Sequence, residues 1–183
     1  MRTLRIRPAL ALLAASALVG ALAPAASAVS TTAAGGHHRA CAAADLSYEA
    51  GSAQPVQAGA LDEHSIFWVG VTNGGSRSCT IDRFPTVTFA GLDGAARPVP
   101  ETQSGPHWIK AGQTRFAALD TYDTAGEPRY VDALTVAADP GHVGVTFVAD
   151  ELDAPPPGIA VYDPCTTLWH DTIEQALDAL PVG

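Results

Sequence analysis

Apolar and polar positions alternate over short stretches through most of this chain, which is the pattern of β-strands. The alternation is clean over Thr86–Phe89 and over residues 131–136 and 143–147. Residues 66–71 instead form an unbroken apolar run, Ile-Phe-Trp-Val-Gly-Val, which is typical of a central strand covered on both faces. Further short runs predict strands at residues 43–50, 97–99, 116–121 and 159–162.

Turn-forming residues separate these runs. Asn73-Gly74-Gly75 follows the long apolar run, and Asp139-Pro140-Gly141 separates two later runs. Asp93-Gly94 lies between residues 86–89 and 97–99, which indicates a hairpin. Seven or eight short strands with turn signals between them predict an all-β fold, an antiparallel β-sandwich, with a closed barrel as the alternative.

The end of the chain departs from the strand pattern. Asp171 and Glu174 have the spacing of a capping box, and Pro181 would end a helix. One helical face would carry Ile173, Ala176, Leu177 and Leu180. The competing interpretation is a final strand over residues 167–173. We expect an edge strand into Trp169, followed by one or two turns of helix.

The beginning of the chain has the pattern of a signal peptide. Arg2, Arg5 and Arg7 precede an apolar run over residues 8–23, and Ala26-Ser27-Ala28 offers small residues for cleavage after Ala28. The apolar run is too short to span a hydrocarbon layer of ~30 Å comfortably. We therefore expect export, no stable membrane insertion after cleavage, a flexible arm over residues 29–40, and one β-sandwich domain over residues 41–183.

Composition and charge limit the classes of partner that the protein can bind. Hydrophobic residues are 47% of the chain, enough to bury a core, and the net charge is −9. Removal of residues 1–28 leaves 155 residues with seven basic and 19 acidic side chains, a net charge of −12. This balance argues against nucleic acid and anionic membrane as partners, because both require a basic surface.

No common catalytic motif is found in the sequence. It lacks a Gly-x-Ser-x-Gly elbow, a phosphate-binding loop, a dinucleotide fingerprint, His-Glu-x-x-His and Cys-x-x-Cys. We therefore expect a protein that is not an enzyme and holds no cofactor, with a secreted hydrolase of unrecognised type as one alternative.

Histidines on the arm supply a second alternative, a secreted copper-binding protein. His37 and His38 lie in the arm, and imidazole binds copper readily. Cleavage after Ala34 would place Gly35-Gly36-His37 at the amino terminus, which forms a square-planar copper(II) site. The acidic residues at 150, 151 and 153 match no calcium loop, and we interpret them as a solvated loop.

Several motifs in order along the chain resemble one known family. They are Cys41 followed by Leu46, Val71-Thr72-Asn73, Cys79-Thr80-Ile81, Pro85-Thr86-Val87, Ile109 to Thr114 with Gly112 between them, and Cys165. This order resembles the actinobacterial secreted family called domain of unknown function 4232, over roughly residues 41 to 175. The resemblance implies an immunoglobulin-like sandwich and export, and it implies no reaction. The chain departs from the family in having Arg83 where a Gly is usual, and no fourth Cys before Tyr130.

Three cysteines in an exported chain allow one disulfide and one remainder. If residues 43–50 and 64–72 pair in antiparallel fashion, Cys41 and Cys79 fall at the same end of the sandwich. A Cys41–Cys79 disulfide is therefore favoured, and Cys41–Cys165 is the alternative. Cys165 would then be either a buried free thiol or the link of a covalent dimer.

Three tryptophans complete the set of candidate residues. We expect Trp68 in the core, whereas Trp108 and Trp169 fall near strand ends, where an aromatic side chain could contact a partner. The overall prediction is a secreted, acidic, non-enzymatic module that binds an unknown protein or cell-envelope ligand, as a monomer or as a Cys165-linked dimer.

Overall fold

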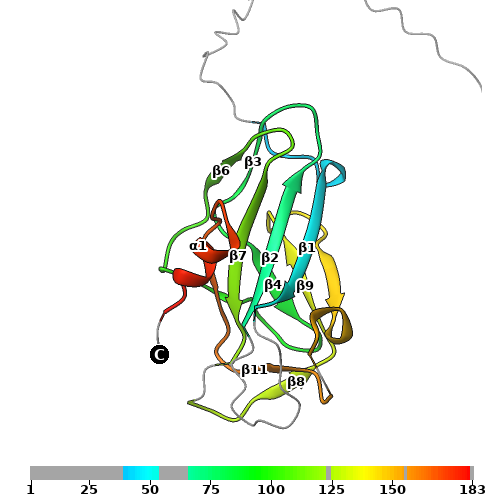
Figure 1. Cartoon of the computed structure of the whole chain (residues 1–183), viewed down its shortest axis with the longest axis vertical. Helices are drawn as coiled ribbons and strands as arrows, with labels where there is room; N and C mark the ends of the chain where they lie inside the picture. The colour runs from blue at the N-terminus through cyan, green and yellow to red at the C-terminus, as the bar shows by residue number, and fades with distance from the viewer. Residues whose placement is uncertain (1–38, 54–65, 123–124, 155, 182–183) are drawn as a thin grey trace, which may run out of the picture. The chain divides into compact units, whose positions relative to one another are not determined.

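The computed structural model describes residues 39–53, 66–122, 125–154 and 156–181, and these residues form a two-layered β-sandwich (Figure 1). The predicted signal peptide, its cleavage point after Ala28, and the arm with His37 and His38 lie outside these residues. The strands are β1 (Leu46–Ser52), β2 (Ile66–Asn73), β3 (Cys79–Asp82), β4 (Thr86–Phe89), β5 (Arg97–Val99), β6 (Pro106–Ile109), β7 (Thr114–Asp120), β8 (Arg129–Val131), β9 (Ala133–Ala137), β10 (Val145–Val148), β11 (Ile159–Val161) and β12 (Cys165–Thr167). Two 3-10 turns, η1 (Ala43–Asp45) and η2 (Ala149–Leu152), and one helix, α1 (Ile173–Asp178), complete the described elements.

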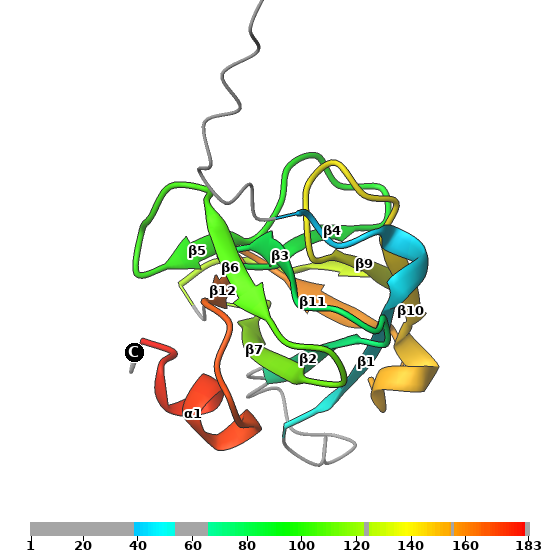
Figure 2. The same ribbon diagram turned by 90° about the horizontal axis from the view of Figure 1, so that it is seen from above.

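One layer is a five-stranded sheet in the order β1-β2-β7-β12-β5. The predicted antiparallel pairing of the first two strands is confirmed: Leu46 lies opposite Asn73, and Ser52 lies opposite Phe67. The first strand begins at Leu46 rather than at residue 43, because η1 occupies residues 43–45. The other layer contains the sheet β10-β9-β4, with the pairs β3-β6 and β11-β8 at its ends (Figures 1 and 2). The predicted all-β sandwich is confirmed.

Alternating side chains of both layers fill the interior. Phe67, Val69 and Val71 of β2 point inward and are at most 2% exposed. They meet inward residues of β4, β7 and β9 in one apolar cluster, among them Val87, Phe89, Ala117, Leu119, Leu134 and Val136. Period-two alternation therefore decides which face of each strand is buried.

Trp68 is not in this core, which corrects the expectation from the apolar run. It lies on the opposite face of β2 from Phe67, where it is half-buried and packs edge-on against Phe116 with ring centroids 6.1 Å apart. An unbroken apolar run hides the alternation, so the sequence alone did not separate the inner residues from Trp68.

The hairpin expected between residues 86–89 and 97–99 forms only next to its turn, where Thr88 and Ala95 make an antiparallel bridge, and β5 itself does not pair with β4. The chain does turn back after β4, since Ala96 N donates to Val87 O across 2.9 Å. β5 then leaves β4 and pairs in parallel with β12, so that Arg97 lies opposite Cys165. A backbone hydrogen bond from Arg97 to Pro164 (2.9 Å) holds this crossing.

The end of the chain combines a strand and a helix, as expected, with two corrections. β12 lies between β7 and β5 and is therefore an interior strand, not an edge strand. The N-cap of α1 is Thr172 rather than Asp171: the Thr172 hydroxyl accepts a hydrogen bond from Gln175 N at 3.3 Å. Asp171 is instead ion-paired with Arg115 of β7. No helix in the described part of the chain is long and apolar enough to span a membrane.

Candidate binding surface at the disulfide end

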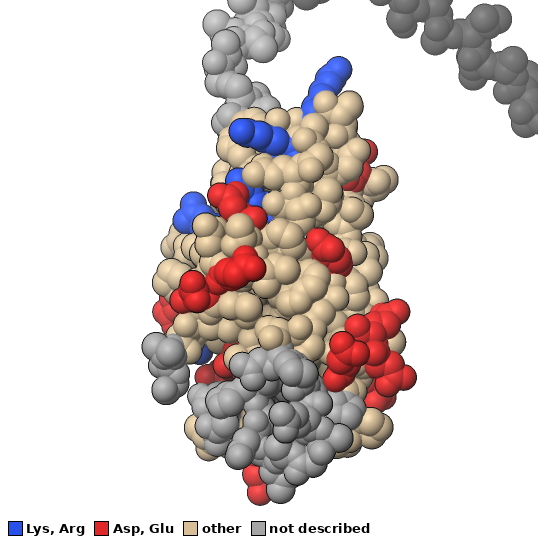
Figure 3. Space-filling view, in the orientation of Figure 1, with Lys and Arg blue, Asp and Glu red and all other residues tan. Residues whose placement is uncertain are grey.

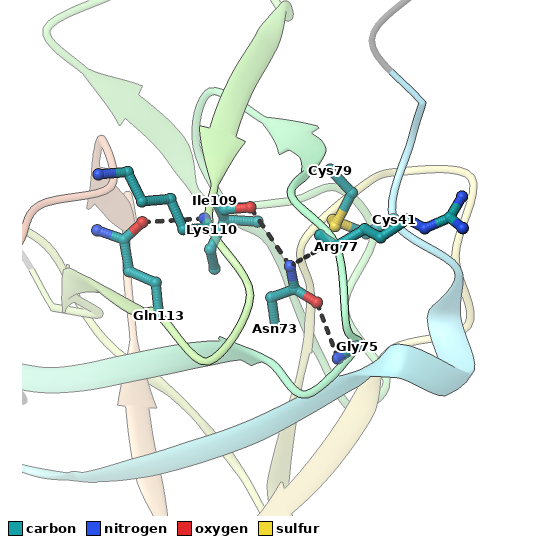
Figure 4. Close-up of a disulfide and its surroundings, with 8 residues drawn as sticks. All are labelled: Cys41, Asn73, Gly75, Arg77, Cys79, Ile109, Lys110 and Gln113. Atoms are coloured by element: carbon teal, nitrogen blue, oxygen red, sulfur yellow. Dashed lines mark hydrogen bonds between the residues drawn. A yellow bond between two sulfur atoms is a disulfide. The ribbon is translucent and has the colours of Figure 1, made fainter.

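A disulfide closes one end of the sandwich. Cys41 and Cys79 are bonded, with their Cα atoms 4.9 Å apart, and both are buried (Figure 4). Cys41 N donates to Thr80 O at 2.8 Å, and Thr80 N donates to Arg39 O at 3.0 Å. Residues 39–41 thus run alongside the start of β3 in parallel. The favoured pairing is confirmed, and the Cys41–Cys165 alternative is wrong.

Asn73, the last residue of β2, holds the neighbouring loop. Its side chain is fully buried. The amide nitrogen donates to the backbone oxygens of Arg77 (2.9 Å) and Ile109 (3.3 Å), and the amide oxygen accepts from Gly75 N (3.0 Å; Figure 4). One side chain therefore satisfies three backbone groups from two loops, which would otherwise be costly to bury.

The second loop, between β6 and β7, is tied to the same residue. Gly112 N donates to Asn73 O at 2.7 Å, and Asn73 N donates to Gln113 O at 3.0 Å. Gly112 has φ +70°, a conformation that favours glycine. Lys110 lies exposed in this turn, and its backbone N–H is capped by the Gln113 side chain at 3.0 Å. Both loops thus present their side chains on a fixed backbone.

A hollow of about 310 Å³ opens beside the disulfide. Two arginines, Arg39 and Arg77, and one carboxylate, Asp45, are its charged lining residues, and two serine side chains add hydroxyls. The remaining lining comes from residues Ala40, Cys41, Ala42 and Cys79, with Ser76 and Ser78 as the serines. Guanidinium groups bind carboxylates through paired, charge-assisted hydrogen bonds, so the hollow suits an anionic group.

Charge is unevenly distributed over the domain, and we refer to Arg39, Arg77 and Lys110 as the basic end. These are three of the seven basic residues that follow residue 28, in a region with 19 acidic ones. Figure 3 shows basic side chains gathered toward the disulfide end, whereas acidic side chains lie mainly lower on the same face. The domain is therefore acidic overall and locally basic where its two tied loops meet.

The two tryptophans expected to contact a partner differ. Trp108 is 45% exposed on β6, as a contact residue requires, whereas Trp169 is only 5% exposed and belongs to the core. Trp169 follows an interior strand, so it lies between layers rather than at an edge. Trp169 is therefore a structural residue, and its indole N–H has no hydrogen-bond partner among the described residues.

Cys165 carries a free thiol, buried between β7 and β5. Burial raises its pKa, with a further upward contribution from Asp120 that Arg97 opposes. A buried thiol whose pKa is raised is a poor nucleophile. This placement matches the structural interpretation of Cys165 and gives no support to a covalent dimer.

In the part of the chain that the structure describes, no three His, Cys, Asp or Glu side chains lie together as a metal ion would require. In the acidic loop, the Glu151 carboxylate accepts a hydrogen bond from Val148 N at 3.1 Å and so caps its own turn. The copper alternative depends on His37 and His38, which are outside the described residues.

No local sequence pattern marks the basic end. Arg39, Arg77 and Lys110 are more than 30 positions apart in sequence, so no run of charge reveals them. The available signal was indirect: several motif residues noted in the sequence, Cys41, Asn73, Cys79 and Gly112, all meet at this end.

A family model described as a domain of unknown function, DUF4232, matches residues 41–170. No curated protein and no solved structure matches the chain.

Proposed function

The chain belongs to the DUF4232 family, and we propose that it is a non-enzymatic extracellular binding module that contacts an acidic segment of a partner protein through its basic end. The observation that carries this proposal is the hollow between Arg39 and Arg77, on loops fixed by the disulfide and by Asn73.

Charge supports this surface as the contact. The region after residue 28 has a net charge of −12, so it repels polyanions at long range. A short acidic segment that reaches the basic end avoids most of that repulsion and meets Arg39 and Arg77. Extended polyanions such as nucleic acid are disfavoured for the same reason.

The rigidity of its loops also supports the basic end as the contact surface. Binding costs less when the contact loops are already ordered, and here the disulfide and the Asn73 hydrogen bonds order them before a partner arrives. A volume of about 310 Å³ is at the lower limit of small-molecule pockets. It suits one or two acidic side chains better than a large ligand.

The disulfide and the signal pattern support an extracellular location. Disulfides persist in oxidising compartments, and Cys41–Cys79 stabilises the loops that form the contact. The sequence pattern before Ala28 is that of an exported protein.

A charge-neutralising pair of variants tests the proposal. The exported chain and its Arg39→Gln/Arg77→Gln variant are titrated with a synthetic glutamate-rich peptide, and Arg129→Gln, an exposed arginine of β8, is the control. We expect the double variant to lose about tenfold or more in affinity, about 1.4 kcal/mol, and the control to bind as the parent does. Equal affinities in all three proteins, or no binding by the parent at low salt, would contradict the proposal.

A further inference from the structure

Asn73 is the only asparagine in the sequence, and Gly74 follows it. In an unfolded chain, asparagine loses its side-chain amide most readily when glycine comes next, because glycine has no Cβ to hinder its nitrogen or restrict its backbone. The function proposed for the basic end uses Asn73 only as a support for two loops. Its position before a glycine is a separate chemical feature of the same residue.

This deamidation joins two groups that are adjacent in the chain. The backbone nitrogen of Gly74 loses its proton to a base and attacks Cγ of the Asn73 side chain. A bond forms between that nitrogen and Cγ, the bond from Cγ to the side-chain nitrogen breaks, and ammonia leaves with the proton that the base returns. The resulting five-membered succinimide then adds water. Addition at Cγ gives aspartate, and addition at the backbone carbonyl gives isoaspartate, so water is the only co-reactant.

The folded chain restrains both reacting groups. Gly74 N–H donates to the backbone oxygen of Asp45 at 2.8 Å, so the nitrogen that would attack is held as a hydrogen-bond donor. The amide nitrogen of Asn73, which would leave, donates to two backbone oxygens, and the amide oxygen accepts from a backbone N–H (Figure 4). Asn73 is also 0% exposed, which keeps its Cγ away from water. The native fold therefore protects Asn73 from deamidation.

Part of this protection depends on the disulfide. The η1 turn, which contains Asp45, begins at Ala43, close behind Cys41. Cys41 is bonded to Cys79 and also donates a backbone hydrogen bond to β3 at 2.8 Å. The turn that supplies the acceptor for Gly74 N–H is thus attached covalently to the start of β3. Breaking the disulfide loosens this turn and, with it, the restraint on the attacking nitrogen.

Neither product of the reaction can restore the contacts of Asn73. A carboxylate only accepts hydrogen bonds, whereas the amide nitrogen of Asn73 donates to the backbone oxygens of Arg77 and Ile109. Those oxygens would face a negative charge in a buried position, which is costly. Isoaspartate also adds a methylene to the backbone, which displaces the hydrogen bonds of Asn73 with Gly112 N (2.7 Å) and Gln113 O (3.0 Å). Either product therefore loosens both loops of the basic end.

We propose that Asn73-Gly74 is a modification site, at which unfolding or loss of the disulfide permits deamidation and permanently disrupts the basic end. A molecule that stays unfolded loses the one side chain that ties its two loops together, so it cannot return to the native arrangement. The proposal does not depend on the function proposed for the basic end, because deamidation and refolding are both measured without a partner.

Rates of deamidation test the protection. The chain is incubated in mildly alkaline buffer with and without guanidinium chloride, and mass spectrometry of the peptide that contains Asn73 measures replacement of the side-chain NH₂ by OH. We expect the folded chain to react at least ~100-fold more slowly than the denatured chain, because reaction requires the loop to open. The Cys41→Ala/Cys79→Ala variant should react faster than the parent in buffer alone. Equal rates in the folded and denatured parent, or no reaction in the denatured parent, would overturn the proposal. An equal rate in the cysteine variant would overturn the part assigned to the disulfide.

Gly74→Ala is the matched control, because it shares every other reaction of the unfolded chain. Gly74 does not have a positive φ, and an added Cβ would lie 3.4 Å from Asp45 O, an ordinary contact distance, so the variant should fold as the parent does. In denaturant it should deamidate about tenfold more slowly or less, since the alanine methyl group hinders the nitrogen. After long incubation in denaturant and dilution, the parent should lose its native melting transition in proportion to the deamidated fraction, whereas Gly74→Ala should recover it. Native stability in the deamidated parent, or equal deamidation of the two proteins in denaturant, would overturn the proposal.

Discussion

The side-chain amide of Asn73 donates to the backbone oxygen of Arg77 across 2.9 Å, and so connects the end of β2 to the loop that carries one arginine of the basic end. The same amide reaches Ile109 O, and its oxygen accepts from Gly75 N. The buried side chain of Asn73 thus fixes the position of the loop that carries the charged Arg77.

Asn73→Ala should therefore destabilise the domain by about 2–4 kcal/mol, because it leaves three backbone groups unpaired, one of them, Ile109 O, in a buried hydrogen bond. The matched control is Asp139→Ala, which removes a similar turn hydrogen bond, Gly141 N to Asp139 Oδ1 at 2.8 Å, from an exposed hairpin loop. We expect less than ~1 kcal/mol there. Urea unfolding of both variants measures the difference, and similar losses would refute the special role of Asn73.

Replacing both disulfide cysteines by alanine should lower the free energy of unfolding by roughly 4 kcal/mol, because the bond closes a loop with a sequence separation of 38. The variant should also bind the glutamate-rich peptide more weakly, since residues 39–41 lose their covalent attachment beside β3. Denaturant unfolding and peptide titration check the two effects. An unchanged affinity in a folded variant would separate the disulfide from the binding surface.

Cys165 should react slowly in the native protein. Its thiol is 6% exposed, and its pKa is raised mainly by burial, so little thiolate is present at neutral pH. We expect iodoacetamide to label it rapidly in denaturant and at least tenfold more slowly in buffer. Rapid native labelling, or a disulfide-linked dimer on a non-reducing gel, would show that the thiol is accessible.

Stability should fall in acid partly through His107. Its pKa in the folded state is lowered from 6.5, so below pH 6.5 the unfolded chain binds the proton more readily. The stability that neutral His107 contributes is present above pH 6.5 and is lost as the pH falls from 6.5 through the lowered pKa of the folded state. His107→Gln should therefore show a smaller loss of melting temperature between pH 7 and 5 than the parent. Parallel pH profiles for the two proteins would exclude this role.

Much of the fold follows from local pattern, because alternation and turn residues act over short distances. The β1–β2 pairing and the β9–β10 hairpin are of this kind, and the pairing of those first strands was enough to favour Cys41–Cys79. β5 was misplaced because a three-residue strand carries no information about its partner. Trp169 was misplaced because its burial depends on β12 being an interior strand.

The candidate site was less predictable than the fold. The basic end consists of residues from three separate segments, which reach the same end of the sandwich only after β1, β2 and β6 have been placed; Arg39 and Arg77 line one hollow, and Lys110 points to the other side (Figure 4). Surfaces assembled from distant segments leave no local pattern to find.

The central claim is that a partner binds at the basic end, and backbone amide shifts of the ¹⁵N-labelled chain test it most directly. On titration with the glutamate-rich peptide, we predict the largest changes at residues 39–45, 74–80 and 110–113, with loss of the effect in Arg39→Gln/Arg77→Gln. Changes confined to β8 and β11 at the other end of the sandwich, or no changes at low salt, would contradict the claim.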